Sequence, residues 1–201
     1  ASLSSLIDVY WGPVVDIHDE NCPIIGAMGR SFSSNPNVIF DLCQSFIKVF
    51  HHHGIQVCAK HFPGHGAVPS DTHTDVSTCD LSYEDLTQHI SPFKYLHGIY
   101  NIPIMTSHVI YNSVSDSPVT VSSKWLSNLS ESIFKSKPFF VSDDLEMIAD
   151  GIDSCSDIIQ TTLRNPPLSC YRALLEVSNR KNKHNGELNT NIHTTQTEKT
   201  F

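Results

Sequence analysis

The chain has 201 residues, of which 39% are hydrophobic and 17% are charged, a composition typical of a globular protein with one substantial core. Thirteen basic residues against twenty-one acidic ones give a formal net charge of −8, which argues against binding to nucleic acid or to an anionic membrane surface. No apolar run approaches the ~18 residues of a membrane-spanning helix, and the first residues lack the pattern of a signal peptide.

The first predicted elements are two short β-rich runs within residues 6–17, separated by a Gly-Pro turn. Asn35 and Pro36 then have the pattern of a helix N-cap followed by proline in the first turn. Apolar residues at helical spacing extend this helix to Gly54, a residue type that commonly ends helices.

Residues 55–60 form the next predicted strand, and a loop rich in glycine, proline and histidine follows over residues 61–75. Ser82 with Asp85 three residues later resembles a capping box. We therefore expect a second helix that begins there and ends at Gly98.

The last predicted elements are strands at residues 102–109 and 138–142 and a helix at residues 122–134 between them. Strands that alternate with helices at this spacing indicate βα units around a parallel sheet. Two architectures fit, an open doubly wound sheet and a (β/α)8 barrel.

Polar residues that follow the predicted strands favour the barrel. A barrel collects active-site residues at the carboxyl ends of many strands, whereas an open sheet binds its ligand at one switch point. The sequence contains no glycine-rich nucleotide loop. The residues at predicted strand ends are Arg30, Lys60, His61, His108, Asp143 and Asp144.

The six cysteines are scattered and form no C-x-x-C pair, so they do not indicate a disulfide framework. We expect buried or half-buried free thiols in a reducing compartment, which makes the cytoplasm the expected location.

The densest polar signal is the segment KHFPGHG at residues 60–66, followed by Asp71 and His73. A carboxylate at Asp71 can hold the Nδ1–H of His73 and raise the basicity of Nε2, as a general acid/base near neutral pH requires. Two alternatives remain open on the residues alone. The histidines are metal ligands, or they are ordinary polar loop residues.

Asp143 and Asp144 end an apolar strand. A carboxylate at that position suits a nucleophile or a group that stabilises a cationic transition state. The alternative is that one of the two caps the following helix. Arg30 has two equal interpretations, a clamp on a ligand oxygen and a salt bridge within the rim.

Four motifs, GPVVDI, GRSFSSNP, KHFPGHG with its following D-x-H, and SDDLEM, together resemble family 3 glycoside hydrolases between residues 6 and 147. They are most similar to the bacterial β-N-acetylglucosaminidases of peptidoglycan recycling. The combination of KHFPGHG with D-x-H is the most specific of these motifs.

The resemblance implies that Asp143 is the nucleophile of a retaining hydrolase and that His73, held by Asp71, is its general acid/base. It also implies that three residues bind sugar hydroxyls, namely Arg30, Lys60 and His61. The implied substrate is a muropeptide with a terminal β-linked N-acetylglucosamine, hydrolysed without a cofactor or metal. We expect a monomer.

The chain also departs from the family pattern. The acidic residue and the Gly-Gly-Arg stretch of the family's early strands have no counterpart, and the pattern fades after Met147. We therefore expect a partial barrel of marginal stability over residues 1–150, a diverged helical segment over 151–177 and a disordered polar tail over 178–201. The rival hypotheses are a catalytically impaired remnant, a sugar-binding module and a metal-dependent hydrolase.

Overall fold

The computed structural model of the chain describes residues 7–70 and 77–144. Within these residues every strand pair is parallel, and helices alternate with groups of strands along the chain, which confirms the expected α/β class. The domain boundaries expected at residues 150 and 177 lie outside the described residues.

The strands follow one another in chain order across the molecule. β1 (Val9–Tyr10) pairs with β2 (Gln56–Val57), and a single bridge between Val14 and Lys60 continues this contact toward β3 (Ala59–Phe62). β3 pairs with β5 (Ile104–Thr106), which pairs with β7 (Phe140–Ser142). A separate two-stranded pair joins β4 (Thr78–Cys79) to β6 (Ile110–Tyr111).

Helix α1 (Pro36–His52) begins where the sequence indicates. The Asn35 side chain accepts a hydrogen bond from the Asn37 backbone N–H at 2.9 Å, and Gly54 adopts a left-handed conformation with φ of 74° just after the helix. Its buried residues are spaced four apart, so they lie on one face of the helix: Ile39, Cys43 and Ile47.

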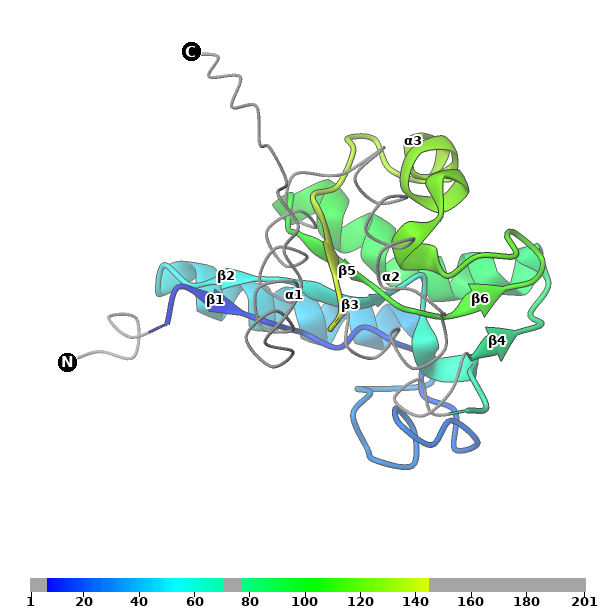
Figure 1. Cartoon of the computed structure of the whole chain (residues 1–201). Helices are drawn as coiled ribbons and strands as arrows, with labels where there is room; N and C mark the ends of the chain where they lie inside the picture. Colours follow the sequence, from blue (N-terminus) through cyan, green and yellow to red (C-terminus); the bar gives the residue numbers. More distant parts are fainter. Residues whose placement is uncertain (1–6, 71–76, 145–201) are drawn as a thin grey trace, which may run out of the picture.

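Helix α2 (Tyr83–Tyr100) begins at the predicted cap, where the Ser82 hydroxyl accepts from the Asp85 backbone N–H at 3.1 Å. It runs past the predicted end at Gly98, because Asn101 adopts the left-handed conformation that stops a helix. Figure 1 shows α1 and α2 side by side behind the strands, and they contact each other, with α1 against β2 and α2 against β3.

The predicted helix at residues 122–134 is divided in the structure. A short 3-10 turn, η3 (Val119–Val121), precedes a π-helical segment, η4 (Lys124–Leu129), and one turn of α-helix, α3 (Ser130–Ile133). Trp125 and Leu126 of η4 are buried against the sheet.

The core is centred on the Phe62 ring, at the end of β3. Its ring centroid lies 5.6 Å from that of Phe93 in α2, 5.7 Å from Trp125 in η4 and 5.6 Å from Phe140 in β7. One aromatic side chain thus joins the sheet to helix α2 and to the helical segment η4.

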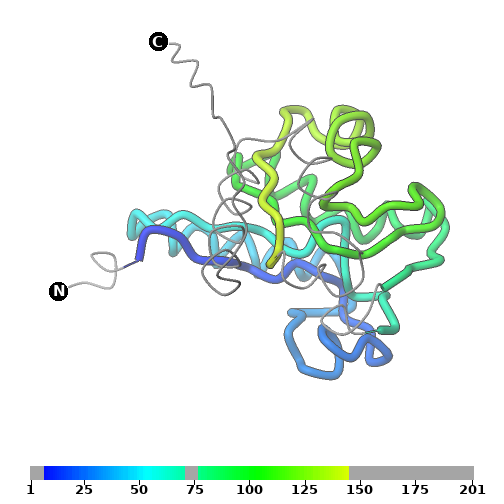
Figure 2. The backbone as a smooth tube through the Cα atoms, in the orientation of Figure 1, coloured from blue at the N-terminus to red at the C-terminus, as the bar shows by residue number. Residues whose placement is uncertain are grey.

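The loop of residues 17–35 extends beyond the strands as a separate lobe, drawn in blue in Figure 2. A small apolar cluster of Cys22, Ile24 and Ile25 holds this lobe together. The lobe carries Arg30 to the strand ends, where the candidate site lies.

Candidate active site

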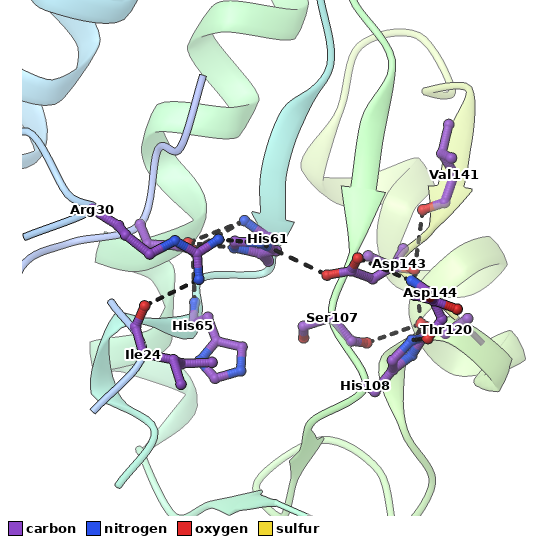
Figure 3. Close-up of polar contacts among 12 residues, drawn as sticks. Ile24, Arg30, His61, His65, Ser107, His108, Thr120, Val141, Asp143 and Asp144 are labelled. Carbon is purple, nitrogen blue, oxygen red and sulfur yellow. Dashed lines mark hydrogen bonds and ion pairs between the residues drawn. The ribbon is translucent and has the colours of Figure 1, made fainter. Parts of the chain in front are cut away.

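Three of the residues singled out in the sequence meet at the carboxyl ends of the strands. His61 belongs to β3, Asp143 directly follows β7, and Arg30 comes from the lobe of residues 17–35. His61 lies between the other two, as Figure 3 shows. Adjacent parallel strands bring these ends to the same edge of the sheet, as their register requires.

His61 is held in place by Asp16, whose side chain is fully buried. The His61 Nδ1 atom lies 2.7 Å from Asp16 Oδ2, and the His61 backbone N–H donates to Asp16 Oδ1 at 3.1 Å. The His65 backbone N–H donates to the same Oδ1 at 2.8 Å. A carboxylate only accepts hydrogen bonds, so the ring proton of His61 lies on Nδ1 and Nε2 faces the site.

The Nε2 atom of His61 faces both other residues. Arg30 Nη2 lies 3.4 Å from it, and Asp143 Oδ2 lies 3.7 Å from it. Arg30 is itself oriented by a hydrogen bond from Nη1 to the Ile24 carbonyl oxygen at 3.0 Å. A cation and a carboxylate are thereby fixed on either side of one imidazole.

The Asp143 carboxylate is oriented from its own backbone side. The Asp144 backbone N–H donates to Asp143 Oδ1 at 2.9 Å, and the Asp143 N–H donates to the Thr106 carbonyl oxygen at 3.4 Å. The side chain keeps 27% of its surface exposed. The carboxylate is therefore anchored through Oδ1 and accessible to a ligand.

Burial and the neighbouring histidines have opposite effects on the pKa of Asp16. Burial acts to raise its pKa, but the attraction and hydrogen bond of His61, together with His65, outweigh burial and hold the pKa below its usual range. Asp16 is thus an anion inside the protein, paired with the His61 ring. Burial lowers the pKa of His65 to about 4 against the attraction of Asp16, so that ring is neutral.

Cysteine chemistry does not compete at this site. Burial raises the pKa of Cys43 and Cys58 to about 12, which keeps both thiols protonated and poorly nucleophilic. The four cysteines in residues 7–70 and 77–144 are buried free thiols, as the sequence predicts: Cys22, Cys43, Cys58 and Cys79.

Two glycines shape the loop that follows His61. Gly64 has a φ of 135°, a conformation that other residues rarely adopt. A Cβ at Gly66 would overlap the Ile17 carbonyl oxygen. The loop can therefore approach the segment after Asp16 only with glycine at this position.

The structure brings some of the predicted site residues together and does not describe others. Arg30, His61 and Asp143 are brought together, as the strand-end argument predicts. Lys60 precedes His61 in β3 and is half-buried, and within residues 7–70 and 77–144 its ammonium group makes no ion pair. Asp71 and His73 lie outside the described residues, so their proposed pairing stays a prediction.

Asp16 was not assigned a role from the sequence. Its signal was nevertheless present, since it ends an apolar run just as Asp143 does. No group of three or more histidine, cysteine, aspartate or glutamate side chains arranged to hold a metal ion occurs in the described part of the chain.

The sequence model of the glycosyl hydrolase family 3 N-terminal domain matches residues 4–164, which is most of the chain. This chain belongs to glycosyl hydrolase family 3. The match includes all three residues that converge at the candidate site and the Asp16 anchor behind them.

Individual members of family 3 are also similar to this chain, in sequence and in structure. A protein of Nitrosomonas eutropha named β-hexosaminidase is 33% identical over 144 residues, which cover 71% of this chain and 41% of that protein. A crystal structure of NagZ from Neisseria gonorrhoeae in complex with N-trifluoroacetyl-D-glucosamine has a TM-score of 0.68 and 30% identity. It covers 80% of this chain and 46% of the crystallised one.

The fold also matches a family 3 β-N-acetylglucosaminidase from Paenibacillus sp. with a TM-score of 0.72 and 23% identity, over 87% of this chain and 36% of that structure. This chain therefore spans less than half the length of each of these three relatives. None of its described helices is long and apolar enough to cross a membrane.

Proposed function

We propose that this chain carries the nucleophile of a retaining glycosidase that releases terminal β-linked N-acetylglucosamine. The single observation that carries the proposal is the convergence of Arg30, His61 and Asp143 at the strand ends of a family 3 domain. The name β-hexosaminidase among its relatives supports the same reaction class.

In the proposed reaction an Asp143 oxygen attacks the anomeric carbon of the sugar. The C1–O bond to the leaving group breaks as the C1–Oδ bond forms, giving a glycosyl-aspartate. The Oδ2 atom is suited to the attack, because Oδ1 is engaged by the Asp144 N–H whereas Oδ2 faces His61 at 3.7 Å.

The leaving oxygen takes its proton from an acid, for which we propose His73 held by Asp71. Water then attacks C1, the same imidazole accepts its proton, and Asp143 is released as a carboxylate. This assignment rests on the D-x-H motif alone, since both residues lie outside the described part of the chain.

We propose that Arg30, His61 and Lys60 bind the hydroxyls of the sugar. A guanidinium donates several hydrogen bonds in a fixed fork, and the Ile24 carbonyl keeps this fork turned toward His61. His61 is kept in one tautomer by Asp16, so the same Nε2 atom faces the ligand in every molecule.

We further propose that the parallel strands belong to a (β/α)8 barrel of which this chain contributes part. The consecutive order of the segment around Val14, then β3, β5 and β7 supports this architecture over a doubly wound sheet, whose strand order reverses at a switch point. We also propose that the enzyme is a monomer and that it acts on muropeptides in the cytoplasm.

The test is turnover of a chromogenic β-N-acetylglucosaminide by the full chain and by Asp143→Asn. We expect hydrolysis by the unchanged chain and loss of at least ~1,000-fold in kcat for Asp143→Asn, because the amide cannot form the covalent intermediate. Asp116→Asn, which changes an exposed carboxylate outside the site, is the matched control and should keep full activity.

A folded chain that binds N-acetylglucosamine in calorimetry without hydrolysing the chromogenic substrate would refute catalysis. It would identify the chain as a sugar-binding or impaired member of the family. Activity that a chelator abolishes would instead favour the metal-dependent alternative.

A further inference from the structure

We propose that His108 is a positioning residue that sets the orientation of the Asp143 carboxylate through the Asp144 backbone. This inference rests on the proposed role of Asp143 as nucleophile. It assigns no contact between His108 and substrate; His108 acts through the backbone to which the nucleophile is attached.

The sheet brings His108 to the nucleophile. Thr106 ends β5 and pairs in register with Ser142, which ends β7. His108 and Asp144 lie two residues beyond these partners, so they leave the sheet side by side. The His108 Nε2 atom lies 2.9 Å from the Asp144 carbonyl oxygen, a contact drawn in Figure 3.

Both backbone polar groups of Asp144 are thereby engaged. Its N–H donates to Asp143 Oδ1 at 2.9 Å, and its carbonyl oxygen accepts from His108 at 2.9 Å. The first bond orients the carboxylate and the second fixes the residue that makes the first. Loss of His108 removes one of the contacts that hold the Asp144 backbone, and with it part of the restraint on the N–H that orients Oδ1.

The Asp144 carbonyl determines which atom donates in its hydrogen bond with His108. A carbonyl oxygen only accepts, so the proton must lie on His108 Nε2. On the opposite side of the ring Nδ1 lies 2.8 Å from the Thr120 hydroxyl oxygen. In the neutral ring Nδ1 accepts the Thr120 proton in place of the Ser107 carbonyl oxygen, and in the charged ring Nδ1 donates to Thr120, whose own proton then goes to Ser107. Nε2 donates to Asp144 in both states.

Thr120 is held rigidly enough to set the ring. It is buried, and its hydroxyl oxygen lies 2.8 Å from the Thr106 hydroxyl and 3.0 Å from the Ser107 carbonyl oxygen. Burial lowers the pKa of His108 against the attraction of Asp143, which favours the neutral ring. The Thr106 hydroxyl oxygen also lies 3.3 Å from the Val141 carbonyl oxygen, so the network extends to β7.

The first test compares His108→Phe with His108→Gln. Phenylalanine keeps a planar ring without a donor, whereas the glutamine amide can place a donor near the position of Nε2. We expect His108→Phe to lower kcat by about 100-fold with KM within about twofold, since a small displacement of a reacting group has a cost of that order. We expect His108→Gln to restore most of the loss.

His97→Phe is the matched control. His97 is another buried imidazole, bonded to the Ile102 carbonyl oxygen at 2.9 Å before β5 begins, away from the strand ends. It should lower stability but leave kcat within about twofold. Unchanged kcat in His108→Phe would overturn the inference, and equal loss in the Phe and Gln variants would show that the imidazole has another role.

A second test does not depend on turnover. Long-range ¹H–¹⁵N spectra of the unchanged chain should place the neutral-ring proton of His108 on Nε2, where the Asp144 carbonyl oxygen accepts it. Amide exchange at Asp144 should rise at least ~10-fold in His108→Phe. A proton on Nδ1 alone, or unchanged exchange, would overturn the inference. An inactive unchanged chain would refute only the proposed function.

Discussion

At the scale of single residues, Asp16 is the counter-charge on which the site depends. It accepts from the His61 ring and from two backbone N–H groups while fully buried. In Asp16→Asn one carboxylate oxygen becomes an NH2 group that faces the N–H donors of His61 and His65, and a buried donor left without an acceptor costs about 1–3 kcal/mol. We expect a loss of that order in the free energy of unfolding, measured by urea titration at pH 7. Asp41→Asn, on the exposed face of α1, should change it little.

The His65 ring makes stability depend on pH. Burial lowers its pKa from 6.5 to about 4, so the unfolded chain binds a proton first as the pH falls. The contribution of His65 to stability should therefore decline by about 3 kcal/mol between about pH 6.5 and 4 and level off below that range. His89 and His108 also have lowered pKa values and add to the decline. Urea midpoints measured across this range should fall less steeply in His65→Gln; an identical slope would contradict the assignment.

The sequence predicted the site residues that follow strand ends and missed those that support them. Arg30, His61 and Asp143 could be predicted because each ends an apolar run or follows one in a recognisable motif. Asp16 and Thr120 could not be assigned roles, because their partners lie 45 and 12 residues away and are chosen by the fold. A buried carboxylate and a buried hydroxyl have no local pattern that names their partners.

At the scale of elements, helix starts were predictable and short strands were not. Asn35 and Ser82 cap their helices through local hydrogen bonds that sequence alone encodes. β4 and β6 have two residues each, which is too short to show the alternation of apolar and polar residues by which a strand is recognised. The π-helical course of η4 was also unexpected, because the buried Trp125 fixes that segment through tertiary contacts with Phe62 and Tyr111.

Phe62 provides the sharpest test of how the elements are joined. Its ring is fully buried among aromatic side chains from α2, η4 and β7. Phe62→Ala leaves a cavity and should lower the free energy of unfolding by about 4 kcal/mol, whereas Phe62→Leu should cost about 1–2 kcal/mol. Phe32→Ala, at a half-exposed ring in the lobe, is the control and should cost far less. Equal losses in Phe62→Ala and Phe32→Ala would contradict this account of the core.

At the scale of the whole molecule, β1 and β7 are outer strands, β1 of the two-stranded sheet that it forms with β2 and β7 of the three-stranded sheet β3-β5-β7. Within residues 7–70 and 77–144 each of them pairs on one side only. β1 and the residue after it also expose large apolar side chains: Val9 at 40%, Tyr10 at 43% and Trp11 at 52%. An unpaired, apolar outer strand is a template for association with other chains.

Charge placed on this outer strand should therefore slow aggregation. We expect Val9→Lys to lower the rate of light scattering at least ~3-fold just below the unfolding midpoint, because a lysine on an outer strand opposes pairing with another chain. Met28→Lys adds the same charge at a more exposed residue, 68% accessible, in the lobe of residues 17–35. Each variant reduces the net charge from −8 to −7, so if net charge alone governs aggregation, neither variant should slow it. A larger effect at Val9 identifies β1 as the strand through which the unfolding chain associates.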